Sequence, residues 1–488
     1  MAVNMKFSLF LFVMLGVVFN GLSYADEAAP KRALKANYVE IYNQQPKSVN
    51  SFSEMFKEGM VYGRLRSNTF FFNYEEETST QKNHITSGLG GSLIYQSAIL
   101  NDFDFRTGFY YSYGFFNIKD NDVSSLKPGQ DVLSRFNYIN NGDKDMSVLG
   151  QAYIRYLGIK KSKIKIGRQL VNTFYAKSND SKMIPNTFDA VVVSTKIIPD
   201  TEATFGYLAY QKLRGHTKTS SVLVYGDSSS SSSLYPQYSE NDDSAMHKGL
   251  TYTALKTAGK STDAPLLVAD IRNNSVKNLK LDASFYSVPE LISQAMMEVN
   301  YKIFSNENLT ITPAIRYIKQ FDNGAGAIGG AAINANPINY KDENSLDSQM
   351  IAARLITKYK NYELNIGYSN VFNESDLVTP WRAFPTAGYT RSMTISNWVA
   401  NTKSYRVQLA INPNKLAVYK NLYMEFSLLH NDADEAKGQY DDNYYYAGFI
   451  KNFDFIENLQ GRIRVGHGDT KKVGADYTDT RVELNYLF

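Results

Sequence analysis

Seven arginines occupy polar positions in segments where apolar and polar residues alternate. In a strand, residues two apart point to the same face, so these arginines lie on the polar faces of their strands. A guanidinium group presents its N–H donors as a planar fork that binds a carboxylate at two points. A row of such groups is suited to passing small carboxylates along, provided that each contact releases its ligand. The seven are Arg64, Arg66, Arg106, Arg155, Arg462, Arg464 and Arg481.

The same arginines also have a simpler explanation, in which each is balanced by a nearby carboxylate. The acidic residues available for this role are Asp104, Glu363, Glu425 and Glu483. For any single arginine the two explanations are equally good. The clustering of the seven arginines favours a row that binds carboxylate solutes. Arg168 fits neither, because it shares a phase with Ile164 and Ile166. Either Gly167 introduces a bulge or Arg168 lies beyond the apolar band.

The composition narrows the class of protein that carries these arginines. Tyr and Phe are abundant, with 36 and 28 copies against 2 of Trp, and cysteine is absent. The lack of cysteine excludes disulfides, Cys-ligated metal sites and a thiol nucleophile. A net charge of +4 is too weak for a nucleic-acid partner. Beyond the N-terminus, no segment approaches the roughly 18 apolar residues of a membrane helix. An outer-membrane β-barrel fits what remains.

The N-terminus predicts export. Lys6 precedes an apolar stretch, residues 7–19, and Ala25 ends a short run of small residues. This is the pattern of a secretory signal peptide over residues 1–25, and the apolar stretch is too short for a membrane anchor. Residues 26–58 do not alternate, and we expect them to form a periplasmic N-terminal segment. The barrel is expected over residues 59–488, in the outer membrane of the cell.

The alternation predicts eighteen antiparallel transmembrane strands. Closing them into a barrel removes the unpaired edges of an open sheet and makes the last strand a neighbour of the first, so the arginines gather on one arc. Connections alternate between short and long, except for a short one at 288–291 where a long one is expected. The predicted strands are 59–75, 84–99, 102–118, 145–158, 162–171, 187–198, 201–214, 265–273, 279–288, 291–304, 308–319, 346–360, 361–372, 403–414, 420–430, 440–453, 458–467 and 475–488.

Residues 147–188 resemble the OprD-type outer-membrane porin family. That family has an "LGxAY…KxGRQ" hairpin followed by a "(D)SRxxPxTF" stretch in its third external loop. Here the matching segments are SVLGQAY at 147–153, IKIGRQ at 164–169 and NDSKMIPNTF at 179–188. Lys182 stands where the family often has Arg. A looser resemblance extends from about residue 59 to the end, and the terminal Phe488 is similar to the C-terminal signature of Gram-negative barrels.

The resemblance implies an eighteen-stranded all-β barrel whose third external loop folds inward to narrow a pore. It also implies a constriction in which a ladder of lumenal arginines faces acidic and polar groups of that loop. The carboxylate of Asp180 either faces the arginines or orders the loop by bonding its own backbone. The loop residues that we assign to the constriction are Asn179, Asp180, Ser181, Lys182 and Pro185.

These features together predict a passive channel for small anionic or zwitterionic solutes that carry a carboxylate. We expect no enzymatic activity, since no histidine accompanies a serine nucleophile motif. We also expect no cofactor and no metal site. The expected partners are the small solutes, outer-membrane lipid and lipopolysaccharide, and the barrel can be a monomer or a homotrimer. The alternative is a structural surface protein or adhesin with a closed barrel. A channel predicts a polar lumen, and a closed barrel predicts bulky apolar residues at inward positions.

Overall fold

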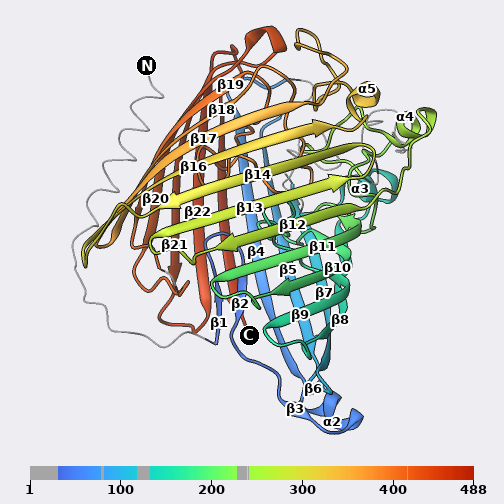
Figure 1. Ribbon diagram of the computed structural model, residues 1–488. Coiled ribbons are helices and arrows are strands. Elements are labelled where there is room, and N and C mark those ends of the chain that lie inside the picture. The colour runs from blue at the N-terminus through green and yellow to red at the C-terminus, as the bar shows by residue number, and fades with distance from the viewer. Residues whose placement is uncertain (1–30, 79–81, 118–131, 228–238, 240, 415) are drawn as a thin grey trace.

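The computed structural model describes residues 31–78, 82–117, 132–227, 239, 241–414 and 416–488. The predicted signal peptide lies outside these residues. Figure 1 shows that the described chain forms one large barrel with the loops gathered mainly at one end.

Eighteen long strands form the barrel wall, and each pairs with its sequence neighbour in antiparallel fashion. The last strand closes the barrel on the first, with Tyr477 opposite Tyr74 and Leu487 opposite Arg64. The wall strands are β4 (Met60–Tyr74), β5 (His84–Gln96), β7 (Phe103–Asn117), β8 (Asp145–Tyr156), β9 (Ser162–Gln169), β10 (Thr187–Thr195), β11 (Thr201–Lys212), β12 (Leu266–Asn273), β13 (Leu279–Val288), β14 (Ile292–Tyr301), β16 (Leu309–Asp322), β17 (Ser348–Tyr359), β18 (Tyr362–Val371), β19 (Thr402–Ile411), β20 (Tyr423–Asp432), β21 (Asp442–Asn452), β22 (Leu459–Thr470) and β23 (Tyr477–Leu487).

The predicted fold class is therefore confirmed, and every predicted strand has its counterpart in the wall. The short connection at 288–291 is also real, because Val288 pairs with Ile292 in a tight hairpin. Alternation works as a predictor here because each wall strand has one face outside the barrel and one face inside. On β23, for example, Val482 and Leu484 are exposed on the outside, while Arg481 and Glu483 are buried.

Shorter elements decorate the barrel. A separate two-stranded sheet pairs β1 (Arg32–Leu34) with β2 (Glu40–Tyr42). The remaining elements are β3 (Ser48–Val49), β6 (Ile99–Leu100), β15 (Phe304–Ser305), α2 (Phe52–Lys57), α3 (Arg135–Asn141), α4 (Tyr252–Thr257), α5 (Gly326–Gly329) and the 3-10 turn η2 (Glu435–Lys437). None of the helices in the described part has the length and apolar character needed to cross a membrane.

Arg168 points out of the barrel, and no bulge explains it. The pairing of β9 with β8 and with β10 is regular on both sides of Gly167. The side chain instead meets Asp189 on β10, with Arg168 Nε 2.7 Å from Asp189 Oδ1. Arg168 can therefore lie among outward-facing apolar residues because Asp189 neutralises its charge on the outer wall.

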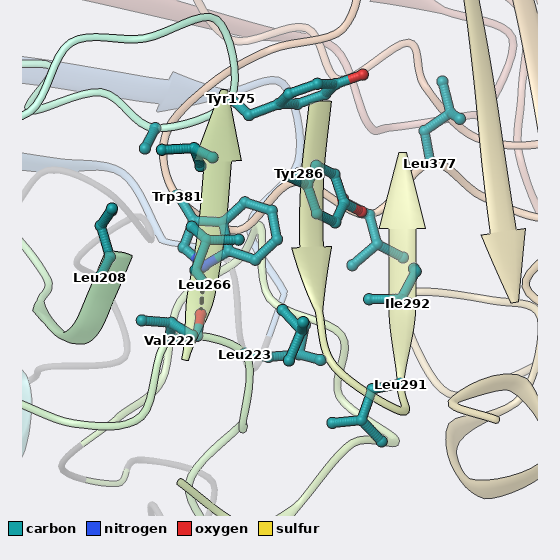
Figure 2. Packing of buried hydrophobic residues seen from close by; sticks show 14 of the residues in the cluster. Tyr175, Leu208, Val222, Leu223, Leu266, Tyr286, Leu291, Ile292, Leu377 and Trp381 are labelled. Atoms are coloured by element: carbon teal, nitrogen blue, oxygen red, sulfur yellow. Dashed lines mark hydrogen bonds between the residues drawn. The ribbon is translucent and has the colours of Figure 1, made fainter. Parts of the chain in front are cut away.

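Inward-folded loops pack on inward-facing apolar side chains of the wall, and three of them supply most of the buried loop residues. These three are the third external loop (170–186), the described parts of loop 213–265 and loop 372–401, and Figure 2 shows their meeting point. Trp381 is fully buried, and its Nε1 donates a hydrogen bond of 2.6 Å to the carbonyl of Val222. The rings of Tyr175 and Trp381 both lie edge-on to Tyr286, with centroids 4.8 Å and 4.7 Å away. We call this buried set, which includes Tyr175, Val222, Leu266, Tyr286, Ile292, Met350 and Trp381, the loop cluster. The alternation of the wall strands did not predict it.

Candidate functional site

Two predicted ladder arginines meet the carboxylate of Asp180. Arg64 and Arg66 are adjacent inward positions of β4 and are almost completely buried. Asp180 lies in the third loop, 2.6 Å from Arg66 Nη1 through its Oδ1, while its Oδ2 contacts Arg64 Nη2. One carboxylate thus bridges two guanidinium groups that would otherwise repel each other. The structure places Asp180 against the arginines, which is the first of the two roles considered for it.

The backbone of the third loop is fixed around this contact. Ser178 closes the loop by donating from its backbone N–H to the carbonyl of Val171 at 3.0 Å, and it accepts from Asn186 at 2.9 Å. Asn179 adopts a left-handed conformation with φ 40°. Short polar side chains tolerate that region best, so a residue of this type suits the turn before Asp180.

Side chains of the third loop dock on the neighbouring wall. Met183 packs against Gly88 of β5, where a Cβ would lie 2.9 Å from its Cγ. Ser181 accepts a 2.8 Å hydrogen bond from Arg214, and the ammonium of Lys182 lies 4.2 Å from the centre of the Phe70 ring. Pro185 leads into β10, and its carbonyl accepts from Lys212 Nζ at 2.8 Å. All five predicted constriction residues therefore lie in a loop that is held against the arginine-bearing wall.

Arg106 and Arg155 lie further along the same wall, on β7 and β8. Arg155 binds Asp104 at two points, with Nε 2.9 Å from Oδ1. Arg106 instead contacts the side-chain oxygen of Gln96 and lies between the rings of Tyr62 and Tyr153, at 5.7 Å and 5.8 Å. Within the described residues Arg106 forms no ion pair, and its Nε lacks a hydrogen-bond partner. It is the predicted ladder arginine whose charge is most available to a ligand.

The remaining three predicted arginines lie on β22 and β23. Arg481 binds Asp479 and Arg464 binds Glu483, both within the wall. Arg462 donates to three backbone carbonyls of residues 34–36. The simpler explanation of the arginines is thus partly right, since five of the seven have a carboxylate partner. Of the carboxylates considered for that role, Glu425 pairs instead with Arg406, and Glu363 with Lys358.

A cavity of about 1090 Å³ runs beside these groups inside the barrel. Of the seven predicted arginines, those that line it are Arg106, Arg464 and Arg481, and Asn179 to Lys182 of the third loop line it as well. Arg64, Arg66, Arg155 and Arg462 are not among the described residues that face it. They lie next to the cavity. Arg64 and Arg66 hold the third loop, Arg155 binds the carboxylate of Asp104, and Arg462 binds the N-terminal segment.

The cavity also has lining residues that the sequence analysis missed. Arg316 on β16 lies opposite the arginines of β22 and β23, with its Nε 2.8 Å from Glu298 Oε2. It shares a phase with Ala314 and Ile318, so strand alternation was a signal that could have revealed it. Arg382 and Arg391 come from loop 372–401, where no periodic pattern exists to reveal them.

Loop 372–401 reaches the lumen by docking on Arg316. The Nη1 of Arg316 donates to the carbonyls of Pro385 and Ala387 at 2.7 Å and 2.9 Å. Gly367 of β18 lets the loop backbone approach, because a Cβ there would lie 2.4 Å from the carbonyl oxygen of Tyr389. The loop therefore contributes charged groups to the cavity as well as apolar groups to the loop cluster.

The described residues contain no group of three or more His, Asp or Glu side chains that is arranged to hold a metal ion. The cavity instead offers guanidinium, ammonium, carboxylate and phenol groups. This set can bind an anion or a zwitterion by hydrogen bonds and charge, and each contact is reversible.

Comparison with known proteins places the fold. No family model and no curated protein matches the chain by sequence. Among solved structures, OccK8 (OprE) of Pseudomonas aeruginosa aligns with a TM-score of 0.66 and 13% identity over 89% of this chain and 99% of its own. The chain has the OprD-type barrel fold.

Two further OprD-type barrels show the same extent of likeness. OccAB3 of Acinetobacter baumannii aligns with a TM-score of 0.65 and 15% identity over 88% of this chain and 99% of its own. The structure of P. aeruginosa OpdK with vanillate aligns with a TM-score of 0.63 and 13% identity over 88% of this chain and 98% of its own. The resemblance read from residues 147–188 is therefore confirmed at the level of the fold.

Proposed function

We propose that this OprD-type barrel is an outer-membrane channel for the passive diffusion of small solutes that carry a carboxylate. The observation that supports this proposal best is the cavity of about 1090 Å³ beside Arg106, Arg464 and Arg481. Its lining mixes positive and negative groups, which suits anionic or zwitterionic solutes. We assign no catalytic role to any of these residues.

In this proposal Asp180 lowers the net positive charge of the constriction between the third loop and β4. It neutralises part of the charge on Arg64 and Arg66, so the guanidinium groups hold the loop as well as attract anions. Arg106 and Arg481 then offer the contacts that a permeant carboxylate exchanges on its way. The exposed apolar side chains of the outer wall would meet lipid or a neighbouring copy of the chain.

The test is single-channel recording of the refolded protein in a planar lipid bilayer, with a salt gradient across it. We expect discrete current steps, a reversal potential that shows anion preference, and a reduced current when benzoate is added. A folded barrel that gives no steps in any salt would overturn the proposal.

The second candidate is a structural surface protein with a closed barrel, and the loop cluster favours it. Tyr286, Leu266 and Ile292 are bulky apolar residues at inward positions, as a closed barrel predicts. They lie, however, on one side of the lumen, and the cavity remains beside them. The same bilayer recording decides between the two candidates, since a closed barrel carries no current.

A further inference from the structure

The N-terminal segment enters the barrel. The hairpin of β1 and β2 does not pair with any wall strand in the described structure, yet Ala33, Leu34 and Tyr38 are buried. Its turn is closed by two hydrogen bonds between Lys35 and residues 38–39, of 2.9 Å and 3.0 Å. Tyr38 lies at the tip with φ 67°, a left-handed conformation that costs a residue with a Cβ about 1 kcal/mol or more. Such a conformation persists only where surrounding contacts hold it.

Those contacts come from the predicted ladder. Arg462 donates to the carbonyls of Leu34, Lys35 and Ala36 at 3.2 Å, 2.6 Å and 3.2 Å. Gln460, two residues earlier on β22, donates to Leu34 as well, at 3.2 Å. The hairpin backbone therefore occupies the donors of Arg462, in the way that the oxygens of a bound anion would.

Tyr38 occupies the next position of the same row. Its hydroxyl donates to Glu483 at 2.9 Å, and its ring lies 4.4 Å from the guanidinium carbon of Arg462 and 5.0 Å from that of Arg464. Because Glu483 is also the partner of Arg464, the tip of the hairpin joins an existing ion pair. Tyr38 also lines the cavity described above, so the tip stands directly in the proposed path.

The other strand of the hairpin faces the constriction. The Tyr42 ring stacks on Tyr62 of β4 with centroids 4.1 Å apart, and Glu40 lines the same cavity as Asp180. No ion pair joins residues 31–45 to the wall in the part of the chain that the structure describes. The hairpin itself contributes only neutral carbonyl, phenol and ring groups to the charged groups of the wall, together with apolar packing of Ala33. Such contacts are weaker than those a carboxylate makes with a guanidinium group.

On its C-terminal side, the hairpin is anchored to the barrel rim. Lys47 and Met55 are fixed at the barrel rim, where their carbonyls accept from Ile99 and Ala98 at 2.8 Å and 2.9 Å. Between this anchor and β2, residues 43–45 are exposed. A short exposed connection next to a fixed anchor allows the hairpin to leave the lumen without any change in the wall.

We propose that residues 32–42 form a gate that opens and closes the lumen from the end where β4 begins and β23 ends. In the closed state the hairpin covers Arg462 and Arg464, and in the open state both become available to a permeant. The inference rests on the proposed channel function, since a gate requires a path to close.

The experiment compares single-channel conductance of three proteins. Wild type is expected to switch between a low and a high level. A variant lacking residues 31–45 is expected to stay at the high level, at least twofold above the low one. The third protein carries Tyr42→Cys and Tyr62→Cys joined by a short bis-methanethiosulfonate, which forms a reducible disulfide with each cysteine as a sulfinate leaves and is specific because the chain has no cysteine. It is expected to stay at the low level until a reductant is added.

The outcomes separate the gate from the channel. If the deletion variant and wild type have the same levels while benzoate still blocks both, the gate is wrong and the channel stands. If no protein carries current, the proposed function itself fails. Should the deletion variant not fold, the cross-linked protein decides alone, and levels that reductant does not change would overturn the gate.

Discussion

The two sides of the lumen differ in what their inward-facing residues do. On one side, the arginine arc of β22, β23, β4, β7 and β8, charged groups are buried and paired, within β23 for Arg481 and across β7 and β8 for Asp104. On the other side, the apolar arc of β11–β14, β16 and β17, side chains such as Leu266 and Tyr286 are buried under the inward loops. The cavity lies between the two arcs, since Arg106 and Arg481 line it from the arginine arc and Asp270, Ser284 and Arg316 line it from the other.

We infer that the apolar arc mainly stabilises the fold and that the arginine arc mainly serves recognition. Burying an apolar side chain stabilises a protein by about 1.5–3 kcal/mol, so the apolar arc fixes loops that would otherwise be free in the lumen. Buried ion pairs add little net stability because their desolvation costs nearly as much as their attraction returns. In the proposed channel, the arginine arc therefore serves the recognition of solutes more than the stability of the fold. Four predictions, from the largest expected effect to the smallest, test this division.

The largest effect is expected for Trp381→Ala in the apolar arc. The substitution removes a fully buried ring and its hydrogen bond to Val222, and such truncations cost about 3–5 kcal/mol. We expect faster proteolysis of loops 213–265 and 372–401, with the barrel still resistant to heat in detergent. Trp381→Phe, which keeps most of the packing, is the control. Equal proteolysis of all three proteins would show that the loop cluster does not hold these loops.

The second-largest effect is expected for Asp180→Asn, which changes the arginine arc. Removing one partner of a buried ion pair costs about 3 kcal/mol, because Arg64 and Arg66 lose their shared carboxylate. The reversal potential in a salt gradient should move toward stronger anion preference. Asp189→Asn is the matched control, since Asp189 pairs with Arg168 on the outer wall. The prediction is wrong if both variants leave the reversal potential unchanged.

Arg106→Gln should weaken carboxylate binding in the lumen. Arg106 forms no ion pair among the described residues, so its loss leaves no orphaned charge that would complicate the result. A charge-assisted hydrogen bond contributes about 2 kcal/mol, which corresponds to roughly 30-fold weaker block by benzoate. Arg168→Gln on the outer wall is the control. Equal loss of block in both variants would argue against a role for Arg106.

The smallest effect concerns pH and the external loops. Burial raises the pKa of Asp376 to about 6, although its carboxylate accepts from the N–H groups of Ile333 and Ala400 and from the Tyr340 hydroxyl. A carboxyl group whose pKa is raised by folding stabilises the fold below its ordinary pKa and loses that contribution as the pH rises through 6.

We therefore expect the loops joined at Asp376 to open about 1.4 kcal/mol more easily at pH 7 than at pH 5. Limited proteolysis at the two pH values measures this difference, with a protease calibrated on an unstructured peptide. Asp376→Asn should remove the pH dependence. A cleavage ratio that is the same in wild type and variant would contradict the assignment.

The sequence predicts the wall well and the interior poorly, for physical reasons. Each wall strand must present one face to the outside and one to the lumen, so alternation alone locates strands as short as β9. The contact of Asp180 with Arg64 and Arg66 could be anticipated because a local motif marks the third loop. Trp381 and Val222 lie in loops without a period, and they meet only after the barrel closes. The same holds for Tyr38 and Glu483, which come from opposite ends of the chain.

The central claim is that solutes pass through the cavity beside the loop cluster, and cysteine accessibility tests it most directly. The chain has no cysteine, so single substitutions report one position each. Gln151→Cys places a thiol on the cavity wall of β8, and Met350→Cys places one on β17 inside the loop cluster. A negatively charged methanethiosulfonate added during bilayer recording should lower the current through the Gln151→Cys protein in discrete steps and leave the Met350→Cys protein unchanged. Equal modification of both, or block at Met350→Cys alone, would contradict a path through the cavity.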